Sequence, residues 1–339
     1  MLIGIHYLRA IAALMVVIFH AISFFVIYRN LSTTLPFYVM SEGVDIFFVI
    51  SGFLMVETTL KCKESRLDFS DFMSKRLLRI GPIYWLITLA IGVMVLARPA
   101  LSEKVVDGTL VLKSLLFLPS KLNTSHLQTT IIPQEWTLIY EMFFYSLFAI
   151  CTSVHYKKGI AATLVILALL VCMHPLAKNF YVQTYTAPII LEFGFGIVIA
   201  LLPRIAAKPA QAALCTAGAL WIVVGGIVAG VDLTYRPLTC GIGAALLIYG
   251  ANGYRPTKRI PLLLILGDAS YSLYLIHMYV IKAAAKFLSP TPFSIVAVIL
   301  IACVTGYFVH TLIENPLQKK AKESMAAIKG MFLRFSMES

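Results

Sequence analysis

The chain has 339 residues, of which 60% are hydrophobic and only 13% charged, and its mean hydropathy is +0.87. Soluble domains are roughly 45–50% apolar and about 25% charged, so this composition excludes a soluble globular protein. The formal net charge of +12 needs no nucleic-acid partner, because lysines and arginines in the loops of a membrane protein set its orientation.

Continuous apolar runs predict an all-α, polytopic integral membrane bundle of about ten transmembrane helices, because a hydrocarbon core needs ~20 residues of helix. A membrane β-barrel would instead show alternating segments of about ten residues. The third and eighth runs are short, which predicts tilted or partly re-entrant segments, and the connection 98–135 contains a short apolar piece at 110–118. The runs lie at 7–28, 38–60, 82–97, 136–153, 159–175, 186–202, 210–230, 236–250, 262–281 and 293–313.

The lysines and arginines are distributed unevenly between the two sides of these runs. Eighteen lie on the side of the N-terminus and nine on the other, with Arg9 left inside the first run. The positive-inside rule then predicts a multi-pass membrane protein with both termini in the cytoplasm. Residues 1–318 are expected to form the membrane domain and residues 319–339 a basic cytoplasmic tail. The six cysteines lack metal-ligand spacing, so no metal is expected.

The first span carries Arg9 and His20 in the stretch HYLRAIAALMVVIFHA. Eleven helical steps amount to about three full turns and a rise of about 16 Å, so both side chains share one face. Arg9 then lies near the cytoplasmic boundary and His20 beyond the middle of the membrane. Polar groups inside a membrane cost free energy, so this alignment favours a functional stripe over a snorkelling arginine and a core histidine.

The second span opens with SEGVDIFFVISGFLM. Asp45 is followed by a mostly apolar stretch, so we expect it to pair with a cation or to line a wet cavity. Ser51 and Gly52 are small enough for close helix–helix contact, which is the expected role of Gly52.

Basic residues precede the third span in the stretch FMSKRLLRIGPIYW. Lys75, Arg76 and Arg79 could act as topogenic charges near anionic lipid. Arg76 and Arg79, at i and i+3, also share a helix face and could grip phosphates as an anion site.

The fourth span begins PQEWTLIYEMFFY. Thr137, Glu141 and Tyr145 are spaced at i, i+4 and i+8, which predicts one polar stripe. Trp136 is in a position typical of an interfacial anchor.

Two polar patterns occur near the end of the chain. Ser270, Tyr274 and His277 are expected on one face of the ninth span. His310 and Glu314 form an i, i+4 pair at the end of the tenth.

Six motifs occur in order between Leu8 and Pro316: RAIAALMVVIFH, GVDIFFVISGF, KRLLRIGPIYW, EWTLIYEMFFY, SYSLYLIH and IENP. Together they resemble the membrane acyltransferase-3 family, and within it most closely the bacterial exopolysaccharide O-acetyltransferases. The resemblance implies a place in the bacterial inner membrane. It also implies transfer of an acyl group, usually acetyl, from cytoplasmic acyl-CoA to a hydroxyl of a polysaccharide or its lipid-linked precursor. Many members append an outer hydrolase-like domain, which this sequence lacks. Transfer is therefore expected to finish in the membrane domain or with a separate partner, such as a polysaccharide-assembly protein.

The family's arginine, ten residues and histidine match Arg9 and His20 of this sequence. A histidine can remove the proton of an attacking hydroxyl near neutral pH, so His20 is the expected general base. Glu141 or Asp45 is expected to orient His20 or stabilise its protonated form, and the sequence leaves the choice between them open.

Acetyl-CoA is the expected co-substrate, and its phosphates call for basic groups at the cytoplasmic mouth. The residues expected on the donor side are Arg9, Lys75, Arg76, Arg79, Trp136 and Tyr145.

Two other classes of protein fit the same composition. A secondary transporter or a glycan-lipid flippase would also contain buried acids and histidines, often in two related halves. The second half has no counterpart of RAIAALMVVIFH, which favours an enzyme. A non-catalytic subunit of a polysaccharide-assembly complex is the third interpretation, and intact Arg9 and His20 disfavour it.

Overall fold

The computed structural model describes residues 2–31, 33, 36–62, 65–98, 106–121, 128–229 and 234–338. Within these ranges the chain is helical apart from loops and one antiparallel pair of two-residue strands, β1 (Ser120–Lys121) and β2 (Gln128–Thr129). Eight of the described helices are long and apolar enough to cross a membrane, and a bent helix pair raises this number to nine. The predicted all-α polytopic architecture is confirmed.

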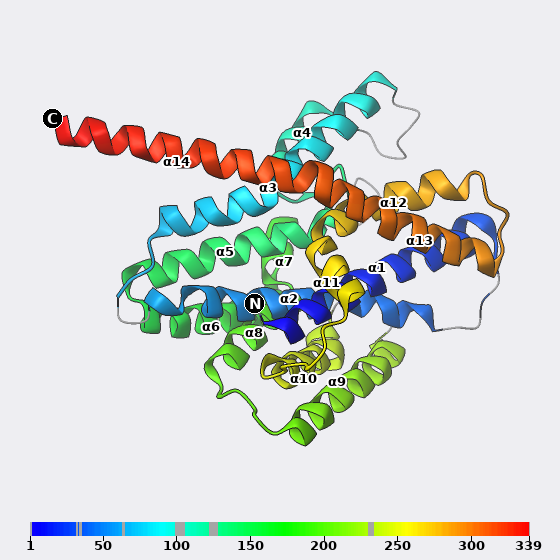
Figure 1. Ribbon diagram of the computed structural model, residues 1–339, viewed down its shortest axis with the longest axis horizontal. Coiled ribbons are helices and arrows are strands. Elements are labelled where there is room, and N and C mark those ends of the chain that lie inside the picture. Colours follow the sequence, from blue (N-terminus) through cyan, green and yellow to red (C-terminus); the bar gives the residue numbers. More distant parts are fainter. Residues whose placement is uncertain are drawn as a thin grey trace.

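The helices form a bundle in which α1, α2 and α5 run in similar directions, while α14 projects beyond the others at the left of the view (Figure 1). The described α-helices are α1 (Ile3–Arg29), α2 (Gly43–Thr59), α3 (Phe69–Ala97), α4 (Gly108–Leu115), α5 (Trp136–Val154), α6 (Tyr156–Met173), α7 (Phe180–Thr186), α8 (Leu191–Leu201), α9 (Lys208–Ala229), α10 (Ile242–Asn252), α11 (Pro261–Asp268), α12 (Ser270–Ala285), α13 (Pro292–Val309) and α14 (Asn315–Glu338).

The outward surface of the bundle is apolar, as expected for contact with lipid. Val93, Phe293 and Leu300 are 66%, 87% and 60% exposed. An apolar surface of this extent is not found on soluble monomers. It matches a protein whose solvent is the hydrocarbon of a bilayer.

Helix α3 is longer than the sequence predicted. The third span was expected to begin at residue 82, but α3 begins at Phe69, where the side chain of Asp68 accepts a hydrogen bond from the Asp71 amide. Pro82 removes one internal hydrogen bond and does not end the helix, because membrane helices tolerate proline where neighbouring elements compensate. The prediction of a short third span is wrong, and the basic residues before it belong to the same helix.

The predicted ninth span is broken. Residues 262–281 divide into α11 and α12, whose axes differ by 76°. At the break the Ser270 hydroxyl donates a hydrogen bond of 2.8 Å to the Gly267 carbonyl. The bend brings the first turn of α12, with Ser270 and Tyr271, to the side of α1 that carries Arg9.

Two glycines allow α2 and α8 to cross in backbone contact. A Cβ atom at Gly52 would lie 2.0 Å from the Phe193 carbonyl oxygen, and one at Gly196 would lie 2.1 Å from that of Val49. Any larger side chain would force the helices apart. The predicted packing role of Gly52 is confirmed, and the crossing is the small-residue contact typical of membrane helices.

Asp45, expected to meet a cation, is paired with Arg236 in the interior. The guanidinium of Arg236 lies 2.7 Å from Asp45 Oδ2 and 3.2 Å from Glu42 Oε2, and all three side chains are at most 5% exposed. The pairing of Asp45 with a cation is confirmed. Arg236, which the sequence placed among the loop charges, is instead a buried structural residue, because its side chain turns into the bundle at the start of a π-helical turn (Pro237–Gly241).

Arg236→Gln is expected to lower the free energy of unfolding by about 3–5 kcal/mol, because it leaves buried carboxylates without their counter-charge. Denaturant titration in mixed micelles measures this loss. Arg204→Gln is the matched control, since Arg204 forms an exposed 2.9 Å pair with Glu57. Such pairs contribute about 0–1 kcal/mol. Equal stability of the two variants would contradict a structural role for the buried pair.

Candidate active site

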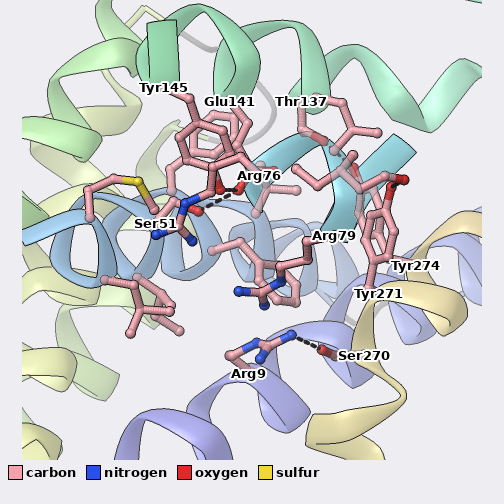
Figure 2. A pocket seen from close by; sticks show the side chains of 18 residues that line it. Arg9, Ser51, Arg76, Arg79, Thr137, Glu141, Tyr145, Ser270, Tyr271 and Tyr274 are labelled. Carbon is pink, nitrogen blue, oxygen red and sulfur yellow. Dashed lines mark hydrogen bonds between the residues drawn. The ribbon is translucent and has the colours of Figure 1, made fainter. Parts of the chain in front are cut away.

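A cavity of about 90 Å³ with both apolar and polar side chains in its wall, here called the inner cavity, lies among α1, α2, α3, α5 and α12. Figure 2 shows the guanidinium groups of three arginines and several hydroxyl-bearing side chains around it. At this volume it holds several water molecules. Its polar lining residues are Arg9, Ser51, Arg76, Arg79, Thr137, Glu141, Tyr145, Ser270, Tyr271 and Tyr274.

Arg9 reaches the inner cavity from α1 and is held at the break between α11 and α12. Its guanidinium donates a hydrogen bond of 2.9 Å to the Ser270 hydroxyl. Ser270 is the first residue of α12, and a helix N-terminus favours negative charge. The arginine and the helix end therefore favour an anion at the same place.

Arg76 enters the inner cavity from α3 and is 9% exposed. It donates a hydrogen bond of 2.7 Å to the Thr58 hydroxyl, and its guanidinium lies 5.1 Å from the centre of the Phe72 ring. Its Nε atom has no hydrogen-bond partner among the described residues. A buried unpaired guanidinium nitrogen costs free energy, so this donor is suited to an anionic ligand.

Glu141 is the acid of the inner cavity. Its Oε1 accepts hydrogen bonds from the Tyr145 hydroxyl and, at 2.8 Å, from the Ser51 hydroxyl. The predicted stripe of Thr137, Glu141 and Tyr145 is confirmed, since all three line this space. One carboxylate faces three arginines, so the inner cavity carries an excess of positive charge.

A larger space of about 600 Å³, here called the vestibule, adjoins the inner cavity. Arg9 and Arg79 line both spaces, which therefore meet at these side chains. The predicted pair of His310 and Glu314 is confirmed at 2.8 Å and lies in the vestibule wall. Lys75 also lines the vestibule, together with Asp71, Asp268, Gln318 and Lys322.

His20 lines neither of these cavities. Its Nδ1 lies 2.9 Å from the Val16 carbonyl oxygen and 3.2 Å from Nε2 of His277. The structure contradicts the expectation that Asp45 or Glu141 supports His20. Asp45 is paired with Arg236. Glu141 is bonded to Ser51 and Tyr145. The neighbour of His20 is a second histidine.

Tyr274 connects the inner cavity with the two histidines. Its ring lines the cavity and lies 5.9 Å, between ring centres, from that of His277. Its hydroxyl donates to the Gln134 carbonyl at 2.5 Å and lies 2.8 Å from the Thr137 hydroxyl. The cavity thus ends one side chain away from the histidine pair.

Trp136 lies outside the lining of both cavities and packs edge-on against Phe48 and Tyr140, at ring-centre distances of 6.2 and 5.8 Å. The sequence assigned it to the donor side, and the structure gives it a packing contact instead. Ser51 was expected only to pack, yet it bonds the acid of the inner cavity. Its position, eight residues after Gly43 at the start of α2, gave no indication of that contact in the sequence.

A vestibule lined by both basic and acidic side chains leads to an arginine-lined inner cavity, and the cavity ends beside a histidine pair. This arrangement suits an elongated donor with several negative charges at one end and a reactive group at the other. The chain belongs to the acyltransferase-3 family of membrane acyltransferases, whose acyltransferase-domain model matches residues 2–312. This family assignment replaces the alternative interpretations of the chain as a transporter or a flippase.

Two relatives are similar to most of the chain. The exopolysaccharide production protein ExoZ of Rhizobium meliloti (strain 1021) is 33% identical, covering 84% of this chain and 92% of the relative. The acyltransferase MdmB of Streptomyces mycarofaciens is 25% identical, covering 82% of this chain and 81% of the relative. No solved structure matches the chain.

Proposed function

We propose that this protein transfers an acetyl group from acetyl-CoA to a hydroxyl of an exported or cell-envelope polysaccharide, or of its lipid-linked precursor. The observation that carries the donor assignment is the convergence of Arg9, Arg76 and Arg79 on one buried cavity. Guanidinium groups bind phosphate oxygens in a bidentate manner. The carbohydrate acceptor is supported by the similarity to ExoZ, which is named as an exopolysaccharide production protein.

The donor fits the site from the vestibule inward. The adenosine part occupies the vestibule, near Lys75 and Lys322, and the phosphates meet the arginines where the two spaces join. The pantetheine arm then follows α1 toward His20, about 16 Å further along the helix. The inner cavity has room only for water, so binding of the arm has to move side chains at its closed end beside Tyr274.

The reaction needs a base for the acceptor hydroxyl and cationic groups that bind the negatively charged donor. His20 takes the proton of the acceptor hydroxyl as its oxygen attacks the thioester carbonyl. The carbon–sulfur bond breaks, the ester forms, and the departing CoA thiolate receives the proton from His20. Arg9 stays protonated and therefore binds the donor without acting as the base.

The proposed orientation places both termini and the vestibule in the cytoplasm of a bacterium, where acetyl-CoA is made. It follows from the excess of lysine and arginine on that side of the sequence. His20 then lies nearer the outer half of the membrane, where an exported carbohydrate presents its hydroxyl.

The experiment supplies acetyl-labelled acetyl-CoA to sealed vesicles prepared from cells that make the protein, in inverted and in right-side-out form. We expect label in the polysaccharide fraction from inverted vesicles only, because acetyl-CoA does not cross a bilayer and the vestibule faces outward only in these. Vesicles that carry His20→Ala are the control. Equal labelling with both orientations would refute the topology, and labelling no greater than in the control would refute the activity.

A further inference from the structure

We propose that His277 is a positioning residue that, together with the Val16 carbonyl, fixes the tautomer of His20 and leaves Nε2 of His20 free to act as the base. The inference rests on the proposed function of His20. It follows from contacts that join α12 to α1 across 257 residues of sequence.

The protonation of His277 follows from its backbone contacts. The residue is fully buried, and its Nδ1 lies 2.7 Å from the Tyr274 carbonyl oxygen and 3.2 Å from that of Leu273. A ring nitrogen that faces carbonyl oxygens must carry a hydrogen, because two acceptors repel each other. A neutral imidazole has one N–H, so Nε2 of His277 bears a lone pair and accepts.

The same reasoning applies to His20. Its Nδ1 lies 2.9 Å from the Val16 carbonyl oxygen, so this nitrogen carries the hydrogen. Nε2 of His277 lies 3.2 Å from it and accepts the same hydrogen. The lone pair of neutral His20 is therefore on Nε2, and this is the atom that can take a proton from the acceptor hydroxyl.

The contact between His277 and His20 also stabilises the positive charge that forms on His20 during the reaction. If His277 were protonated as well, its Nε2–H would point at the Nδ1–H of His20. His277 therefore stays neutral while His20 becomes imidazolium, and the hydrogen bond between them becomes charge-assisted. A buried neutral histidine does here what a carboxylate does in the Ser-His-Asp arrangement.

The position of His277 is linked to the donor cavity. The carbonyl that holds its Nδ1 belongs to Tyr274, whose ring lines the inner cavity and whose hydroxyl is bonded to Gln134 and Thr137. One residue of α12 thus faces the donor and orients the histidine that contacts the base.

Two amide variants of His277 distinguish loss of its hydrogen bond to His20 from a general effect on folding. His277→Gln places an amide oxygen near the position of Nε2 and can accept from His20. His277→Asn reaches only the position of Nδ1, so it keeps a donor toward Tyr274 and lacks the acceptor. Both are buried amides, so their effects on packing are matched.

We expect His277→Asn to lower kcat by roughly 10²-fold, which is less than the ~10⁴-fold loss in the Ser-His-Asp arrangement because the Val16 carbonyl still accepts from His20 Nδ1. Its KM for acetyl-CoA should stay within about twofold of the wild-type value, because donor binding depends on the arginines. His277→Gln should recover at least about tenfold of the lost kcat. Acetyl transfer by the purified, reconstituted full-length protein measures these constants, and CoA binding checks that each variant is folded.

Equal kcat values for the Asn and Gln variants, whether high or low, would overturn the inference, because only one of them keeps the acceptor. His20→Ala is assayed beside them. If His20→Ala is inactive while His277→Asn retains wild-type kcat, the positioning role fails and the proposed function stands. If His20→Ala is active, the assignment of the base itself fails.

Discussion

His20→Ala is expected to lower acetyl transfer by about 10²–10⁴-fold, the usual contribution of a general base. His277, the neighbouring histidine, offers no equivalent lone pair, since it uses both of its ring nitrogens for Tyr274, Leu273 and His20. CoA binding should persist, because Arg9 lies about three helical turns away along α1 and Arg76 and Arg79 lie on α3. Acetyl transfer from labelled acetyl-CoA in reconstituted membranes, at equal protein level, measures the effect.

His174→Ala is the matched control for this substitution. His174 contacts the Thr186 hydroxyl at 3.0 Å and lines neither cavity. Its removal should leave the transfer rate close to that of the wild type. Near-normal turnover of His20→Ala would show that another group removes the proton.

The double substitution Arg76→Gln and Arg79→Gln is expected to weaken CoA binding by about 100-fold or more. Hydrogen bonds to charged groups contribute about 1.5–3 kcal/mol each, and every 1.4 kcal/mol is about tenfold in Kd. Binding to the wild-type protein should weaken as salt rises, because salt screens the attraction between arginine and phosphate. The double variant should lose most of this salt dependence. Calorimetric titration of CoA into the purified protein at two salt concentrations measures both effects.

Arg204→Gln serves as the control for charge removal, since Arg204 pairs with Glu57 and lines neither cavity. It should leave CoA affinity and its salt dependence unchanged. If the folded double variant binds CoA as the wild type does, Arg76 and Arg79 only set the topology of the chain.

The local sequence pattern was sufficient to predict the features that depend on a single segment of the chain. Apolar runs identified the membrane helices, because the thickness of the bilayer fixes the length of a span. Helical spacing placed Thr137, Glu141 and Tyr145 on one face, since residues four apart lie one above the other. The same spacing joined His310 to Glu314.

Local pattern failed where other parts of the chain override it. Pro82 was expected to precede a short span, yet α3 continues through it. The apolar run at 262–281 was expected to be one helix, but it bends by 76° at Ala269. Helix ends depend on whether neighbouring elements satisfy the backbone groups that a break exposes. That information is not local.

By itself, the sequence determined that this is a helical membrane protein with Arg9 and His20 on one stripe, because both properties depend on hydrophobicity and helical period. Only the tertiary structure decided which polar residues of different helices contact one another. It paired Asp45 with Arg236 across 191 residues of sequence and placed His277 against His20. Two segments distant in sequence meet according to how their whole surfaces pack, so no local spacing could have shown that the partner of His20 is a histidine.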